Sequence, residues 1–439
     1  MLSIAADLDS GRTTSLALTE AALARIEDPD GEGRRAFTRV DREAALAQAR
    51  ASDLLRSHGV VPSPLAGVPV SIKDLFDIKG QVTTAGSVVL EDAPPAERDA
   101  PVVARLRAAG AVVVGRTNMT EFAYSGLGLN PHHGCPGNPV DRARVPGGSS
   151  SGGAVSVTDG MAAAAIGSDT GGSVRIPAAF CRLVGFKPSQ KRVCRRGVLP
   201  LSSSLDSVGP IGRSVACCAI LDGVLTGAAF VATEPAELPG LRLGLPKSYV
   251  LEGLDRTVAA AFEDAVRRVE RGHAYVHDLP LPQVDRIPDL NGKGGLTAAE
   301  AYAWHRDLLS RHGERYDPRV RVRIERGAEQ SAADYIDLLH ARAALSAEVE
   351  AATDRFDALL TPTVAIVPPR FDDLVDDVAY AHINNMVLRN TSVWNFIDRP
   401  AVSIPCASGG LPVGLMIIGR RNDDRRLLAI ARALERLVD

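Results

Sequence analysis

The chain has 439 residues, of which 45% are hydrophobic and 23% are charged, a composition typical of a globular protein with a large core. The formal net charge of −3 at pH 7 provides no general basic surface for nucleic acid or for an anionic membrane. No basic segment followed by an apolar run opens the sequence, and no run of about 20 apolar residues occurs, so we expect neither a secretory signal nor a spanning helix.

Predicted helices and strands alternate along the first half of the chain. Apolar residues at helical spacing predict amphipathic helices over residues 13–27 and 43–57. Apolar alternation before Lys73 predicts a strand that ends at this lysine, and residues 111–114 form a second predicted strand, which is expected to be buried. The alanine-rich residues 153–165 are expected to form a helix between two glycine-rich loops.

The second half continues this alternation from Leu241 onward. A strand-like segment, LRLGLP, precedes a helix with apolar residues at helical spacing, and residues 297–355 predict long, charged helices. A closing amphipathic helix is expected over residues 424–438. Strands that alternate with helices indicate an α/β layered structure, which one large domain or two α/β lobes would both satisfy. Three later segments are apolar enough to be buried strands: residues 358–369, 401–405 and 412–419.

A lysine and two serines have a spacing with chemical meaning. Lys73 ends the strand-like AGVPVSIKD, Ser149 lies in VPGGSSSGGA, and Ser173 follows 24 positions later in GSDTGGSVRIPAAF. A serine hydroxyl needs a base to become a strong nucleophile, and the stretch between the two serines contains no histidine and no acid evidently placed for that task. A desolvated lysine can replace histidine as the base, so the pattern indicates acyl transfer by an unusual serine hydrolase.

These three residues and their flanking sequences resemble the amidase signature family of serine amidohydrolases. The similarity extends from about Ala44 to the end, is dense between Gly67 and Pro210, and includes the block GGSSSGGAVSVTDGMAAAAIGSDTGGSVRIPAAFCRLVGFKPS. The resemblance implies one α/β domain over residues 1–439, an α/β/α sandwich with a mixed, many-stranded central sheet. Within it we expect three parts: N-terminal helices (1–60), the signature core (61–215), and a second α/β and helical part that forms the substrate pocket (216–439).

The resemblance also implies a role for each residue of the triad. Ser173 is expected to be the nucleophile, Lys73 the neutral base, and Ser149, after a cis peptide bond from Gly148, the proton relay between them. A free lysine titrates near 10.4, so the base must have a pKa lowered to about 7–8, which burial beside the glycine-rich loops can supply. The backbone amides of the oxyanion hole are then expected to belong to Thr170, Gly171, Gly172 and Ser173.

Other residues near the triad have structural or binding roles in this interpretation. Asp169 and Arg175 are expected to form an ion pair that shapes the nucleophile loop, and a contact from Arg175 to a substrate carboxylate is the less favoured alternative. Ala123 and Tyr124 are expected to line the substrate pocket, since the segment around them does so in relatives. Aromatic residues of the second half line the acyl pocket or, as is more common, pack in the core: Tyr302, Trp304, Tyr316, Tyr380 and Trp394.

The implied activity is hydrolysis of a carboxylic-acid amide C–N bond through an acyl-enzyme on Ser173, with no metal and no organic cofactor. One alternative is the glutaminase-type subunit of a tRNA-dependent amidotransferase, whose glutamine-binding signatures are not evident in residues 301–324. Another is a hydrolase that acts mainly on ureido compounds or esters. The expected partner is a small-molecule amide rather than nucleic acid or a membrane, and a homodimer is common in the family.

Other classes of protein fit the sequence less well. His132 and His133 are adjacent, and the absence of HExxH and HxH motifs disfavours a metal-dependent amidohydrolase. Cys181 and Cys406 lack the partners of a nitrilase-like nucleophile, and neither glycine-rich loop matches a phosphate- or dinucleotide-binding motif. A non-enzymatic binding protein would not be expected to retain the lysine and both serines. The six cysteines form no Cys-x-x-Cys pair, which favours a reducing, cytoplasmic compartment.

Overall fold

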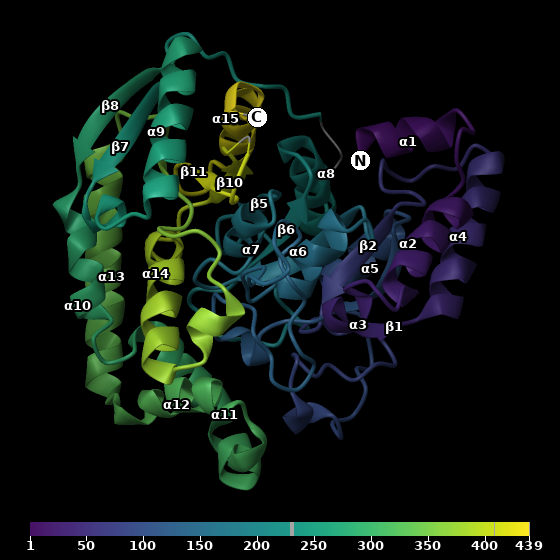
Figure 1. The fold of residues 1–439 in the computed structure, drawn as a ribbon, viewed down its shortest axis with the longest axis horizontal. Coiled ribbons are helices and arrows are strands. Elements are labelled where there is room, and N and C mark those ends of the chain that lie inside the picture. Colours follow the sequence, from purple (N-terminus) through teal and green to yellow (C-terminus); the bar gives the residue numbers. More distant parts are fainter. Residues whose placement is uncertain (229–231, 408, 439) are drawn as a thin grey trace.

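The computed structural model describes residues 1–228, 232–407 and 409–438, and its centre is a single sheet of eleven strands (Figure 1). In space the strands follow the order β1-β3-β2-β4-β6-β5-β10-β11-β9-β7-β8. Their bounds are β1 Phe37–Val40, β2 Pro69–Lys73, β3 Val112–Thr117, β4 Ala164–Asp169, β5 Val184–Lys187, β6 Ser207–Gly212, β7 Arg242–Lys247, β8 Tyr275–Pro280, β9 Ala358–Pro362, β10 Ala401–Pro405 and β11 Gly414–Ile418.

The sheet is mixed and draws its strands from both halves of the chain. Strand β2 lies between β3 and β4 and runs parallel to both, and β7 runs parallel to β8 and β9. The other neighbours pair antiparallel, including β5 with β10, which joins the two halves. The expected mixed, many-stranded sheet is therefore confirmed, and its continuity replaces the alternative of two separate lobes.

Helices pack on both faces of this sheet, as the alternation along β11 shows. Leu415 and Ile417 belong to a hydrophobic cluster with α8, α9 and α15, whereas Met416 and Ile418 belong to one with α13 and α14. Successive side chains of a strand point to opposite faces, so these helix groups form two layers around the sheet. The helices are α1 Leu2–Asp9, α2 Ser15–Glu27, α3 Gly33–Ala36, α4 Arg42–Ser57, α5 Pro101–Ala108, α6 Ser151–Thr158, α7 Arg175–Phe180, α8 Val215–Thr226, α9 Arg256–Arg271, α10 Ile287–Leu290, α11 Gly295–His312, α12 Pro318–Glu325, α13 Ala332–Thr353, α14 Asp377–Phe396 and α15 Asp424–Val438.

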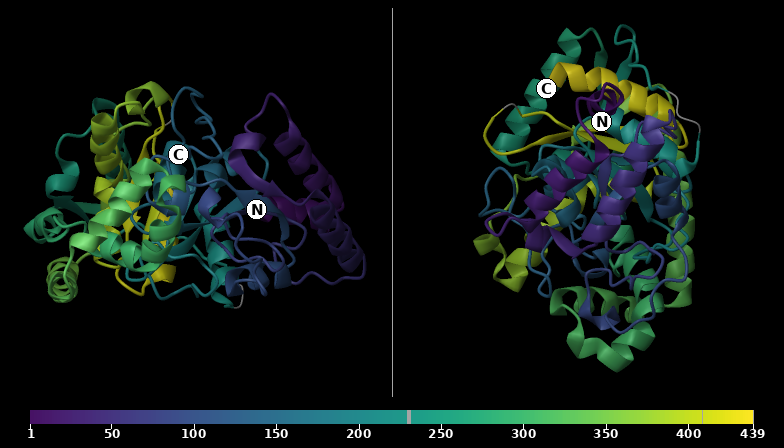
Figure 2. Two further views of the ribbon diagram at one scale, coloured as in Figure 1. Left: turned by 90° about the horizontal axis from the view of Figure 1, so that it is seen from below. Right: turned by 90° about the vertical axis from the view of Figure 1, so that its right-hand side faces the viewer.

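The N-terminal helices and the helices of the second half lie at opposite ends of the molecule. Figure 2 shows the purple N-terminal helices at one end and the green helices of the second half at the other. Between them, α6 and α7 pack on the central strands β4 and β5. The two glycine-rich loops precede α6 and α7, so both loops lie near the middle of the sheet.

Two predicted elements have different bounds in the structure. The helix expected over 153–165 covers only α6, and Ala164 begins strand β4. Alanine favours a helix locally, but β4 lies between β2 and β6, where the sheet pairs its backbone, so tertiary contacts decide. The strand expected over 358–369 ends at Pro362, and two prolines at 368–369 lack the N–H that further pairing would need.

Candidate active site

Lys73 ends the central strand β2 and its side chain is fully buried. All five residues of the strand are buried, because β3 and β4 flank it and helices cover the sheet. The Lys73 Nζ donates hydrogen bonds to Ser149 Oγ at 2.8 Å and to Ser168 Oγ at 2.9 Å. The amine therefore contacts hydroxyls rather than carboxylates.

Burial also changes the protonation of this amine. Desolvation lowers the pKa of Lys73 to about 7, although the negative charges of Asp169 and Asp206 oppose the shift. Close to neutral pH, a large fraction of the amine is then unprotonated and able to accept a proton. This pKa falls at the edge of the range that the base interpretation required.

Ser149 lies in a loop whose backbone is held on several sides. The peptide bond between Gly148 and Ser149 is cis, as the family resemblance implied. A Cβ atom on Gly148 would clash with the backbone of Gly128, so this close approach requires glycine. The Ser149 carbonyl accepts a hydrogen bond from the amide of Thr120 at 3.1 Å, and the hydroxyl is fully buried beside Lys73.

Ser173 lies between β4 and α7 and is 3% exposed. Its carbonyl accepts a hydrogen bond from the Ser150 amide at 3.3 Å, which ties together the two glycine-rich loops. Ser173 lines a cavity of about 340 Å³, and so do Ala123 and Tyr124, the two predicted pocket residues. The structure thus brings Lys73 into contact with Ser149. It also connects Ser173 through its carbonyl to Ser150, the residue that follows Ser149. Among the described residues, no hydrogen bond joins the hydroxyl of Ser149 to that of Ser173.

The predicted oxyanion donors are only partly available. The Gly172 amide donates to Asp169 Oδ1 at 2.9 Å, a bond that competes with its predicted oxyanion role, which stays a prediction. The physical reason for this bond is the buried Asp169 carboxylate, which requires donors and takes the nearest loop amide. Thr170 and Gly171 line the cavity with Ser173, and their amides remain as candidates. Gly172 has a positive φ of 134°, and a Cβ there would clash with Thr391 of α14.

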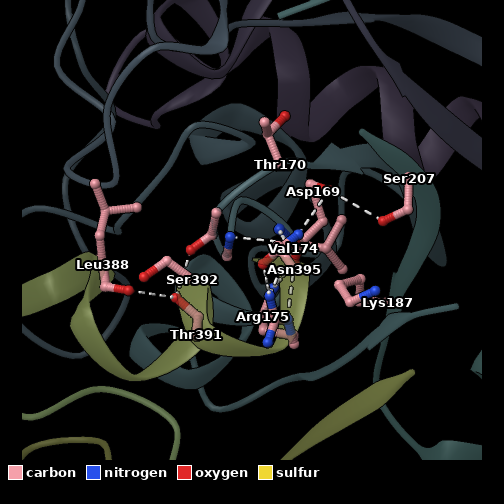
Figure 3. A network of polar contacts seen from close by, with 12 residues as sticks. Asp169, Thr170, Val174, Arg175, Lys187, Ser207, Leu388, Thr391, Ser392 and Asn395 are labelled. Carbon is pink, nitrogen blue, oxygen red and sulfur yellow. Dashed lines mark hydrogen bonds and ion pairs between the residues drawn. The ribbon is translucent and has the colours of Figure 1, made fainter. Parts of the chain in front are cut away.

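Asp169 and Arg175 form a fully buried ion pair beneath the nucleophile loop, with 2.9 Å between Arg175 Nη2 and Asp169 Oδ1. Asn395 bridges both, since it accepts from Arg175 Nη2 at 2.6 Å and donates to Asp169 Oδ1 at 2.9 Å. Figure 3 shows Arg175 and Asn395 beside Asp169 in this network. Burial acts to raise the pKa of Asp169, but the Arg175 charge and hydrogen bonds hold it well below its ordinary value. Arg175 does not line the cavity, so the alternative contact to a substrate carboxylate is not supported.

Asp206 supports the loop from the other side, and sequence reasoning missed it. Its Oδ1 accepts from Thr170 Oγ1 at 2.6 Å and from the Ser202 amide at 3.0 Å. Burial raises the pKa of Asp206 to about 6, although the Thr170 hydrogen bond opposes this shift. Asp206 precedes β6, whose first residue pairs with Asp169, and only this long-range pairing brings the carboxyl to the loop.

The rest of the cavity is lined by residues far from the signature block. Three arginines, Arg323 from α12, Arg326 just after it, and Arg389 from α14, line the same cavity as Ser173. No aspartate or glutamate of the described residues does so. The five aromatic residues considered for an acyl pocket are not among the lining residues either, and three of them are buried in the core: Tyr316, Tyr380 and Trp394.

The described residues also bear on the alternative nucleophile and metal sites. Burial raises the pKa of the Cys181 thiol well above its ordinary value and that of Cys406 to about 12, which disfavours either thiolate. His132 Nε2 lies 2.8 Å from Glu121 Oε1, but no group of three or more His, Cys, Asp or Glu in the described ranges is arranged to hold a metal. Across the described helices, none is both long and apolar enough to span a bilayer.

Comparison with known proteins identifies relatives that share almost the whole chain. 2-Amino-5-chloromuconic acid deaminase of Comamonas testosteroni is 38% identical over 410 residues, covering 92% of this chain and 88% of the relative. A glutamyl-tRNA(Gln) amidotransferase subunit of Myxococcus xanthus is 37% identical over 474 residues, covering 99% of this chain and 96% of the relative.

Solved structures and a family profile agree with these relatives. A crystal structure of an amidase superposes with a TM-score of 0.90 at 35% identity and covers 100% of both chains. The peptide amidase of Stenotrophomonas maltophilia superposes with a TM-score of 0.83 at 28% identity, covering 99% of this chain and 95% of that one. The family profile described as Amidase matches residues 17–428. The chain therefore belongs to the amidase signature family and is a hydrolase that acts on amide C–N bonds.

Proposed function

We propose that this protein hydrolyses a carboxylic-acid amide through an acyl-enzyme on Ser173, activated by a relay of Ser149 and Lys73. The observation that carries the proposal is the contact of 2.8 Å between the fully buried Lys73 amine and the Ser149 hydroxyl. A pKa of Lys73 lowered by burial to about 7 supports its role as a base, because only the neutral amine can accept a proton.

The proposed cycle moves one proton along the relay in each half-reaction. Lys73 accepts a proton from Ser149, which accepts the proton of Ser173 as its Oγ attacks the amide carbonyl. The relay then returns the proton to the leaving nitrogen, and the C–N bond breaks. Water, deprotonated through the same relay, attacks the acyl-enzyme and releases the carboxylic acid. Formation and breakdown of the acyl-enzyme require a small shift of the serine hydroxyls, since they are not bonded to each other in the free protein.

The charge on the carbonyl oxygen needs donors at the point where it develops. We assign this task to the amides of Thr170, Gly171 and Ser173, because the Gly172 amide is bonded to Asp169 at 2.9 Å. Asp206 fixes Thr170 through its side chain, and the ion pair of Asp169 with Arg175 fixes the turn below. Rigid donors of this kind stabilise the oxyanion without reorganisation during the reaction.

The test is a panel of amides, ureido compounds and esters assayed for ammonia, amine or alcohol release, with Ser173→Ala beside the wild type. We expect the variant to lose turnover and a serine-directed phosphonate to label Ser173. Ser151→Ala is the matched control, because Ser151 is buried in the same serine run and its hydroxyl has no hydrogen-bond partner. Phosphonate labelling of another residue, or full activity of Ser173→Ala, would contradict the proposal.

A glutaminase-type subunit is the second candidate, since the glutamyl-tRNA(Gln) amidotransferase subunit of Myxococcus xanthus is 37% identical to this chain and covers 99% of it. The name of that relative describes one part of an assembly, whereas the proposed enzyme acts alone. Glutamine hydrolysis measured with the isolated protein and with proteins that co-purify with it separates the two. Activity confined to glutamine and dependent on a co-purifying protein would favour the glutaminase-type role.

A further inference from the structure

Three arginines from outside the signature block make part of the cavity lining cationic. Arg323, Arg326 and Arg389 line the cavity that Ser173, Thr170 and Gly171 also line. The cavity volume of about 340 Å³ lies at the lower end of the range for small-molecule sites. With no acid of the described residues on its lining, the positive charge of these side chains is not balanced inside the cavity.

None of the three guanidinium groups forms an ion pair within the described part of the chain. Arg323 Nη1 donates to the Tyr124 carbonyl at 2.7 Å, and Arg326 Nη2 donates to the Gly292 carbonyl at 2.8 Å. Arg389 Nε donates to the side chain of its neighbour in α14 at 3.2 Å. A guanidinium has five N–H donors, so each group is oriented by a neutral acceptor and retains donors for a ligand.

Other arginines of the same helix behave differently. Arg319 Nε lies 2.7 Å from Asp377 Oδ1, and Arg321 Nε lies 2.7 Å from Glu325 Oε1. Helix α12 thus carries arginines that pair with acids outside the cavity and one, Arg323, that does not. Arg319 is four residues before Arg323 and lies on the same side of α12, so the two differ in position along the helix rather than in face. Of the two, only Arg323, nearer the end of α12, lines the cavity, and the lack of a carboxylate on the described lining favours a ligand that supplies its own.

We propose that the substrate is a small amide that also carries at least one carboxylate, and that Arg323, Arg326 and Arg389 hold this carboxylate away from the reacting carbonyl. The proposal rests on the proposed function, because it assigns the substrate class of the same site. Arginine suits the task, since its planar group binds a carboxylate through two parallel hydrogen bonds. In the reaction a water oxygen bonds to the carbonyl carbon, the C–N bond breaks, ammonia leaves, and a dicarboxylic acid is the product.

The experiment compares amides that differ only in charge. Succinamate and glutaramate are matched with pentanamide and hexanamide, in which an ethyl group replaces the carboxylate. We expect the wild type to favour the charged member of each pair by about 100-fold in kcat/KM, and Arg326→Gln to reduce that preference by about 10- to 100-fold, mainly through KM. Arg326 is exposed and directly follows α12, so its replacement leaves the core intact. Arg321→Gln is the matched control, because this arginine of α12 faces Glu325 instead.

A binding measurement separates this inference from the proposed chemistry. Calorimetry of succinamate with Ser173→Ala is expected to show binding that Arg389→Gln or Arg326→Gln weakens by about 10- to 100-fold when added to that variant. Such binding without wild-type turnover would reject the hydrolysis but retain the carboxylate site. Hydrolysis of the neutral amides as fast as their charged partners, or no binding of any charged monoamide, would overturn the carboxylate site and leave the hydrolysis standing.

Discussion

The amine of Lys73 and the hydroxyl of Ser149 lie 2.8 Å apart, and neither side chain is exposed to solvent. The two residues come from a central strand and from a loop 76 positions away in the chain. Water is excluded from both side chains, so the protonated amine loses the hydration that would stabilise its charge. The protonation state of Lys73 therefore decides whether this pair can accept a proton.

Replacement of Lys73 tests the base directly. Lys73→Met removes the amine in a buried position without adding a charge, and we expect kcat to fall by about 100- to 10,000-fold, the usual contribution of a general base. Lys73→Arg is expected to be as inactive, because a guanidinium stays protonated. Steady-state kinetics with circular dichroism of each variant checks the result. A Lys73→Arg enzyme that retains the wild-type rate would reject the relay.

The pH dependence follows from the protonation of the same amine. The pKa of Lys73 is lowered by burial to about 7, and the base is active only when neutral. The rate is therefore expected to be low at pH 5, to rise through a midpoint near 7 and to level off above it. The measurement is kcat/KM of one substrate between pH 5 and pH 9, and a rate that is flat across this range would show that Lys73 does not titrate there.

Asp206→Asn tests whether the neighbouring carboxylate tunes that midpoint. The Asp206 charge opposes the lowering of the Lys73 pKa, so its removal is expected to move the rise in kcat/KM to lower pH. Asparagine retains an acceptor for the Thr170 hydroxyl, which limits the structural change. A lower rate with an unmoved midpoint would assign Asp206 to loop support alone.

The buried ion pair beneath the nucleophile is expected to contribute to stability. Arg175→Met leaves the fully buried Asp169 carboxylate without its cation, and removal of one partner of such a pair costs about 3–5 kcal/mol. Urea unfolding should show this loss as a lower midpoint. Arg321→Gln, whose side chain is 44% exposed, is expected to change stability by less than about 0.5 kcal/mol. Equal midpoints for the two variants would contradict the argument.

Parts of the fold were predictable because local pattern and tertiary context agree. Apolar alternation before Lys73 predicted β2, and helical spacing predicted α2 and α4 close to their observed bounds. Strand β4 was missed, since its alanines favour a helix until β2 and β6 pair with the backbone. The order of the eleven strands likewise depends on pairings between distant segments, which no local pattern contains.

The same division holds for the site. Lys73, Ser149 and Ser173 could be identified from the printed residues, because short motifs with a particular spacing carry them and close backbone approach demands their glycines. The occupied Gly172 amide, the contact of Asp206 with Thr170, and the arginines of the cavity emerged only from the folded chain. The Asp206 contact and the arginine lining depend on the packing of segments far apart in sequence, and the Gly172 bond depends on the burial of Asp169. Neighbouring helices and strands decide which groups meet, and the residues that flank each group in the sequence do not.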